Sequence, residues 1–325
     1  MSVNSVIFAN TGAYAALNSM LTAERFQRLS DCKSTAELKK CLTEFGFEGD
    51  TADEMFTRAL DDIYAYLNEN SSIEKARLAI LKKNDYHNAK VMAKCKYVRR
   101  EITPDLLYPY GGVDAAKMKE WIMNDDYALL PAPMAQALEE TDLRFSQGER
   151  NGRLIDLLLN RAMYQDIFNT LGNRYGELKN VFRVEVDFKN ISVAFRVRKN
   201  GLAVSALREE FIDGGKLPYE KVALLCERSK EDIANEFMFS EYKELIFSAF
   251  DETEKAALID FERASDDYII DMLRRHKNDN SDYMMFYGYV LAKLYELKNV
   301  RIVCSGVKAG APKEEIKAKL RKLYV

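Results

Sequence analysis

The sequence predicts an all-α protein, and three observations lead to this fold class. Only 6 prolines and 15 glycines occur among 325 residues, and both residue types interrupt helices and are frequent in β-rich folds. Apolar residues recur at three- and four-residue spacing along much of the chain, which is the period of an amphipathic helix. The third observation is an internal repeat in which one short motif appears three times.

Residues 1–23 contain no charged side chain. A secretory signal needs a basic start and a continuous apolar centre, and a membrane-spanning helix needs about twenty predominantly apolar residues. Polar residues interrupt the segment, so we predict a buried packing helix instead. Its apolar face would hold Val6, Ile7, Ala13, Tyr14, Leu17 and Leu21. The five cysteines form no CxxC pair, which predicts buried thiols in the reducing cytoplasm.

Long amphipathic patterns predict most of the helices. They cover residues 56–67, 154–171, 268–272 and 285–294. Residues 181–197 compete with this assignment, because they alternate between apolar and polar side chains and are rich in β-branched residues, as strands are. The internal repeat aligns these residues with helices. We therefore predict a helix at 181–197 and keep a strand as the alternative.

A tetrad of the form acid-x-x-Asn occurs three times, each time before an apolar and basic run. Its acid and amide residues are Asp85 and Asn88, Asp187 and Asn190, and Glu296 and Asn299. The three Asn residues lie 102 and 109 residues apart. This interval is the size of a domain rather than of a solenoid repeat. We therefore predict three helical repeats, at residues 1–118, 119–222 and 223–325.

A glycine turn follows each tetrad. Gly111-Gly112 begins 23 residues after the first Asn, Gly214-Gly215 begins 24 residues after the second, and Gly310 comes only 11 residues after the third. The third repeat is thus expected to be shortened at its end. None of these glycines belongs to a GxGxxG or GxxxxGK[ST] motif, so the sequence gives no support for nucleotide binding.

The tetrads can be interpreted in two ways. A carboxylate and an amide three residues apart lie on one face of a helix, as a metal or catalytic site would require. No tetrad, however, supplies the several converging oxygen ligands of a calcium or magnesium site. Buried acid and Asn side chains that cap or cross-link helices would explain why the motif recurs. We predict this structural role, with no catalytic, metal-binding or cofactor-binding residues.

Charge and histidine content exclude further classes of function. Lys and Arg number 48 against 51 Asp and Glu, which argues against nucleic acid as a partner. Only two histidines occur, too few for a His-rich metal site. We interpret the basic residues after the tetrads as solvated surface, with a surface that faces an acidic protein partner as the alternative; the candidates are Lys90, Lys94, Arg196, Arg198 and Arg301. A basic amphipathic helix over Lys313 to Val325 is expected to pack on the fold, with anionic lipid as its alternative partner.

The tetrads and the end of the chain carry a family resemblance. Residues 296–301 read ELKNVR, and Gly310, a basic helical pattern over 313–322 and Tyr324-Val325 follow; residues 85–90 read DYHNAK. These phrases resemble the E-x-x-N-x-R and D-x-x-N-x-K motifs of the C subunit of prokaryotic A/V-type rotary ATPases, whose eukaryotic counterpart is the d subunit. The resemblance covers essentially the whole chain.

Two segments depart from that family's pattern. Residues 13–17 read AYAAL where the family usually has A-R-V-R, and residues 45–51 read FGFEGDT where it often has L-x-x-T-x-Y. The first departure removes any contact that the family makes there through an arginine.

The resemblance implies a fold and a mechanical role. The family's C subunit is a pseudo-threefold funnel of helical domains with a central cavity, placed at the cytoplasmic face of the membrane. Such a socket would couple the axle of the central stalk (D/F type subunits) to the membrane proteolipid ring, for ATP-driven proton or sodium transport. The resemblance implies one copy per complex, a monomer when alone, no cofactor and no small-molecule substrate. Two alternatives remain, a helical enzyme with an acidic or metal site and a helical adaptor of another kind.

Overall fold

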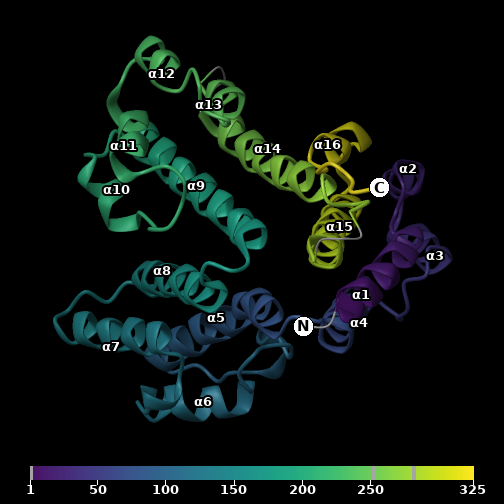
Figure 1. The fold of residues 1–325 in the computed structure, drawn as a ribbon, viewed down its shortest axis with the longest axis horizontal. Helices are drawn as coiled ribbons and strands as arrows, with labels where there is room; N and C mark the ends of the chain where they lie inside the picture. The colour runs from purple at the N-terminus through teal and green to yellow at the C-terminus, as the bar shows by residue number, and fades with distance from the viewer. Residues whose placement is uncertain (1–2, 251–253, 280–282) are drawn as a thin grey trace. The chain divides into compact units, whose positions relative to one another are not determined.

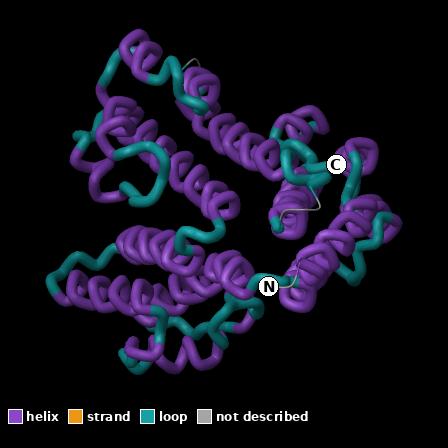
Figure 2. Tube along the Cα trace, viewed as in Figure 1, coloured by secondary structure: helices purple, strands orange, loops and turns teal. Residues whose placement is uncertain are grey.

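The computed structural model describes residues 3–250, 254–279 and 283–325. Every regular element in these ranges is a helix, as Figure 2 shows, so the all-α prediction is confirmed. The chain divides into two compact units. Unit 1 combines Met1–Ser72 with Ser229–Val325, and unit 2 is Ile73–Arg228. The predicted repeat boundaries, and the funnel with its central cavity, stay predictions.

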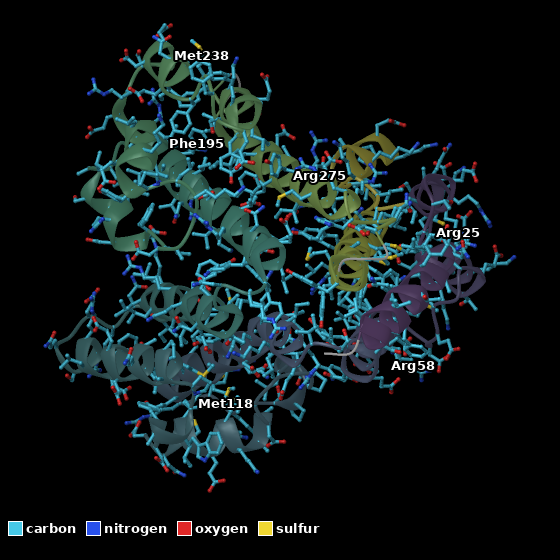
Figure 3. The ribbon with its side chains drawn as sticks, in the orientation of Figure 1. Arg25, Arg58, Met118, Phe195, Met238 and Arg275 are labelled. Carbon is cyan, nitrogen blue, oxygen red and sulfur yellow. The ribbon has the colours of Figure 1, made fainter. Side chains whose placement is uncertain are left out.

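Unit 2 is built on three long helices, α5 (Glu74–Val98), α8 (Gly152–Leu171) and α9 (Gly176–Lys199). Shorter elements cover them: η2 (Pro104–Leu106), α6 (Ala115–Met123), η3 (Tyr127–Leu129), α7 (Ala132–Ser146), α10 (Ser205–Glu210) and α11 (Tyr219–Glu227). Helices α5, α7 and α8 lie side by side, and α10 and α11 pack on α9 (Figure 1). Met118 on α6 and Phe195 on α9, both labelled in Figure 3, are buried in this unit.

The stretch at 181–197 is helical, as predicted, and lies within α9. Its alternating pattern does not indicate a strand because α9 is buried on most of its circumference. Val184 and Val186 are both 0% exposed, although they lie on different sides of the helix. Tertiary packing thus overrides the local preference of β-branched residues for strands.

Unit 1 is centred on α15 (Met284–Lys308), the longest of its helices that the structure describes. Around it lie α1 (Val3–Ala16), η1 (Leu17–Ser19), α2 (Ala23–Asp31), α3 (Thr35–Glu44), α4 (Ala52–Asn70), α14 (Glu254–Arg274) and α16 (Lys313–Ala318). Two further helices, α12 (Lys230–Glu236) and α13 (Lys243–Ser248), precede α14. Helices from both ends of the chain therefore share one core with α15.

Local sequence sets the beginnings of α2, α3 and α4. Thr22, Ser34 and Thr51 each accept a hydrogen bond from the backbone N–H three residues later. Such caps satisfy one of the four N–H groups that the first turn of a helix leaves unpaired.

The N-terminal helix is only partly as predicted. Ala9 and Ala13 are buried, and α1 contacts α15. Ile7 and Tyr14, however, are 43% and 60% exposed, so their assignment to the buried face is wrong. The small side chains let α1 approach α15 closely, and the large apolar ones are left on the opposite side.

The predicted C-terminal helix is shorter than expected. Helix α16 ends at Ala318, and residues 319–325 are not helical. Ile316 and Tyr324 are each 3% exposed, so the segment packs on the fold. The helix does not continue because both backbone groups of Arg321 bind the side chain of Asn299.

Candidate functional site

The asparagine of each tetrad binds one distant residue through both of that residue's backbone groups. Asn88 Nδ2 donates to the carbonyl oxygen of Tyr108 at 2.8 Å, and the N–H of Tyr108 donates to Asn88 Oδ1 at 2.8 Å. Asn190 makes the same pair of bonds to Ile212, at 2.8 and 2.9 Å. We call this arrangement an Asn clamp.

Asn299 forms the third Asn clamp. It donates to the carbonyl oxygen of Arg321 at 3.0 Å and accepts from the N–H of Arg321 at 2.8 Å. A short helix, η2, α10 or α16, precedes the clamped residue in each case. The predicted repeat therefore corresponds to a recurring piece of three-dimensional structure.

The acids of the first two tetrads hold the chain just before a helix. Asp85 accepts from the N–H groups of Gly112 and Val113, each at 3.1 Å, and α6 begins two residues after Val113. Asp187 accepts from the N–H groups of Lys216 and Leu217 at 3.1 and 3.0 Å, and α11 begins two residues after Leu217. Each acid thus fixes the starting point of the next helix.

This arrangement explains why glycine follows the first two tetrads. A Cβ atom added at Gly111 would overlap Oδ1 of Asp85, and one added at Gly215 would overlap Oδ1 of Asp187. Only glycine lets the main chain come this close to the carboxylate. The turn at Gly310 has no such contact, since nothing lies within 4 Å of a Cβ placed there.

The third acid binds the beginning of the chain instead. Glu296 Oε2 accepts from the N–H of Leu21 at 2.6 Å, and Oε1 accepts from Lys293 Nζ at 2.6 Å. Helix α2 begins at Ala23, again two residues after the residue that the acid holds. The N-terminal segment therefore meets the third acid, whereas segments that follow the tetrad meet the first two.

All six tetrad side chains are buried, with exposed fractions between 0% and 5%. Burial raises the pKa of Asp85 to about 6, although the N–H groups of Val113 and Gly112 act in the opposite direction. In the described residues, no three His, Cys, Asp or Glu side chains gather as a metal site would require. The polar groups of the tetrads bind the main chain of the protein itself, except that Glu296 Oε1 binds the side chain of Lys293.

The five candidate partner-facing basic residues all have contacts within the chain. Lys90 Nζ donates to Asn160 at 2.9 Å, and Lys94 Nζ lies 2.6 Å from Asp156. The other contacts are Arg196 with Glu210 at 3.8 Å, Arg198 with the carbonyl oxygens of Leu225 and Arg228, and Arg301 over the ring of Phe56. Lys94 and Arg196 keep about half of their side-chain surface exposed, at 43% and 52%. A role toward a partner stays a prediction.

Two ion pairs in unit 2 were not predicted from the sequence. Lys82 Nζ lies 2.8 Å from Asp166, which also accepts from the hydroxyl of Tyr86 at 3.3 Å. Lys83 Nζ lies 2.7 Å from Glu185. Polar residues 82, 90 and 94 of α5 face residues 166, 160 and 156 of the antiparallel α8, a register that is set by packing between the two helices and that the sequence does not show.

The described residues contain no helix long and apolar enough to cross a membrane. Three long helices, each of which holds a later main-chain residue through an Asn clamp, define a helical protein with a recurring motif. The sequence profile of the ATP synthase (C/AC39) subunit family matches residues 9–319, and the chain belongs to this family.

Individual relatives agree with the family assignment. The C subunit of the A-type ATP synthase of Halorubrum lacusprofundi is 26% identical over 253 residues, which cover 74% of this chain and 72% of the relative. The protein of the same name from Haloferax volcanii is 26% identical over 64% of this chain and 59% of its own length. That of Methanosarcina mazei is 25% identical over 84% of this chain and 77% of its own length.

Proposed function

We propose that the chain is a non-catalytic coupling subunit in the central stalk of an A/V-type rotary ATPase. It would be a socket that receives the tip of the axle (D/F type subunits) and sits on the membrane proteolipid ring. The observation that carries this proposal is the family match over residues 9–319. The relatives are named as C subunits of A-type ATP synthases, and such a subunit works within a multi-subunit rotary machine.

The buried polar contacts support a mechanical role. A part that transmits torque must not change shape under load, and buried, fully bonded polar groups rigidify a fold. The three Asn clamps and the buried acids bind main-chain segments far away in the sequence. We propose that the tetrads serve this structural purpose and take no part in chemistry. The half-exposed Lys94 and Arg196 are then candidates for orienting an acidic partner.

The proposal also specifies where the chain is located and how many copies of it one complex contains. The chain would be peripheral on the cytoplasmic face of the membrane, present in one copy per complex and monomeric when alone. Three helical repeats, at 1–118, 119–222 and 223–325, would surround a funnel-shaped cavity for the axle. Proton or sodium transport would follow the identity of the ring.

Binding and activity assays on the purified full chain test this function. We expect it to bind a purified axle complex or a detergent-solubilised proteolipid ring, and to hydrolyse no ATP by itself. Robust ATP turnover, or stoichiometric bound metal, would favour a helical enzyme that uses Asp85, Asp187 or Glu296. Failure to bind either partner, without activity, would favour an unrelated adaptor.

A further inference from the structure

Two free cysteine side chains meet where α2 and α3 join. The Sγ atoms of Cys32 and Cys41 lie 3.7 Å apart, with the Cys32 thiol directed at Cys41. The carbonyl oxygen of Arg28, 3.4 Å from Cys32 Sγ, is the alternative acceptor for its single S–H. A disulfide bond needs about 2.05 Å between the two sulfur atoms. The thiols are therefore in contact but must move closer to form a covalent bond.

The surrounding structure keeps these thiols together. Leu29 of α2 and Leu38 of α3 are buried in one apolar cluster with Cys32, and the Arg28–Glu44 ion pair, at 2.7 Å, joins the same two helices. Cys32 itself lies just beyond the last residue of α2, in extended backbone with φ −62° and ψ 132°. Its N–H nevertheless donates to the carbonyl oxygen of Leu29 at 3.3 Å, so the backbone of Cys32 stays attached to the end of α2.

The two sulfur atoms differ in their access to solvent. Cys32 is 7% exposed, and burial raises the pKa of its thiol to about 12. Cys41 is only partly buried, and it interacts with Arg28 at the surface. Arg28 lines a surface pocket together with Thr22, Glu24, Arg25, Glu44 and Phe45; Arg25 is labelled on α2 in Figure 3. Because Cys41 is the more exposed of the two residues, we expect a small oxidant in solution to reach it first.

We propose that Cys32 and Cys41 are a modification site, a dithiol that hydrogen peroxide converts reversibly into a disulfide. The Cys41 sulfur attacks one peroxide oxygen, the O–O bond breaks, and a sulfenic acid and one water molecule form. The Cys32 sulfur then attacks the Cys41 sulfur while its S–H proton passes to the sulfenic hydroxyl, the S–O bond breaks, and a second water molecule leaves. Both thiol protons end in the two water molecules, and two electrons pass from the sulfur atoms to the peroxide.

The bond would join the end of α2 to α3 within a stretch of ten residues. These helices share their apolar cluster with Val300, Val303 and Ile316 from the other end of the chain. The disulfide would restrict the unfolded chain, so the oxidised protein is expected to melt at a higher temperature than the reduced protein. This inference does not depend on the proposed coupling function.

Peptide mapping of the full chain tests the proposal. Trypsin places Cys32 in residues 29–33, Cys41 in residues 41–58 and Cys304 in residues 302–308, so each disulfide gives a distinct pair of peptides. After treatment with hydrogen peroxide and alkylation of the remaining thiols, we expect the linked 29–33/41–58 pair as the main product. Dithiothreitol should release both peptides and return the melting temperature to that of the reduced protein.

Variants and competing products make the test specific. Cys41→Ser should abolish the linked pair, whereas Cys226→Ser, which changes a buried thiol of unit 2, should leave its yield unchanged. The proposal is overturned if wild-type protein accumulates sulfenic or sulfinic acid at Cys41 without the linked pair. It is also overturned if Cys304, or a second chain, is the main partner of Cys41. Because the wild-type protein gives these results, a misfolded variant does not prevent a decision.

Discussion

The carboxylate of Glu296 accepts a hydrogen bond from the backbone N–H of Leu21, which lies 275 residues away in the sequence, at 2.6 Å. Asp85 and Asp187 make the corresponding bonds to residues fewer than 31 positions away. In the third tetrad, the acid and the main-chain segment that it holds thus come from opposite ends of the chain. Unit 1 is closed by its N-terminal segment, and unit 2 is closed by consecutive segments.

The Asn clamps are expected to contribute strongly to stability. Asn190→Ala would leave the buried N–H and carbonyl groups of Ile212 without partners, and we expect a loss of about 2–4 kcal/mol in the free energy of unfolding. Asn180 is half-buried on the same helix, and Asn180→Ala should change that energy by less than about 0.5 kcal/mol. Urea denaturation followed by circular dichroism measures both variants. Equal effects of the two substitutions would contradict a special role for the clamp.

The glycine that faces Asp187 should tolerate no side chain. Gly215→Ala places a Cβ atom against the carboxylate and pushes it away from the N–H groups of Lys216 and Leu217. We expect a loss of about 2–3 kcal/mol. Gly176→Ala is the matched control, because nothing lies within 4 Å of its added Cβ atom. If Gly215→Ala melts at the same temperature as Gly176→Ala, the close approach does not constrain this position.

Asp85 should make unit 2 more stable at mildly acidic pH. Its pKa is about 6 in the folded protein, against an ordinary value of 3.8, so folding favours the protonated form. Its contribution is fully present below pH 3.8 and is lost as the pH rises through about 6. The free energy of unfolding of wild type minus that of Asp85→Asn should therefore be larger at about pH 4 than at about pH 7, by up to about 3 kcal/mol. Denaturation at several pH values measures this difference; a difference that is constant, or that grows with pH, would refute the assignment.

Removing one member of the buried pair Lys82 and Asp166 should lower the free energy of unfolding strongly, whereas replacing both members should lower it less. Lys82→Met leaves the carboxylate of Asp166 without its cation at 10% side-chain exposure, and we expect a loss of about 3–5 kcal/mol. The double variant Lys82→Met, Asp166→Leu should lose less than the single variant, because no uncompensated charge remains. A double-mutant cycle in urea denaturation gives the coupling energy. Additive effects would mean that the two side chains do not interact.

Much of the fold could be predicted from the sequence because its signals are local. Helical periodicity and the tetrads predicted the long helices, and the repeat identified the helix at 181–197 where residue preferences favour a strand. The hydrogen-bond partner of Glu296, the acid of the third tetrad, could not be predicted. Leu21 offers only a backbone N–H, which nearly every residue has. Gly310 lies where a third glycine turn is expected, but no side chain approaches it as Asp85 and Asp187 approach theirs.

The contacts of the basic residues could not be predicted from the sequence either, for a related reason. Lys90 and Lys94 follow the first tetrad, and no residue near them in the sequence indicates which side chains they contact. Their contacts with Asn160 and Asp156 depend on the register of α5 against α8, which is set by packing between two separate helices. Helical periodicity gives the faces of a helix but not the alignment of one helix with another.

The central claim is that this chain couples the axle to the ring, and ATP-driven ion transport by reconstituted vesicles tests it most directly. A rotary complex assembled without the chain should hydrolyse ATP at its catalytic head without moving ions. Adding the purified chain should restore transport in proportion to the amount bound, up to one copy per complex. Full transport in vesicles that lack the chain would contradict the account.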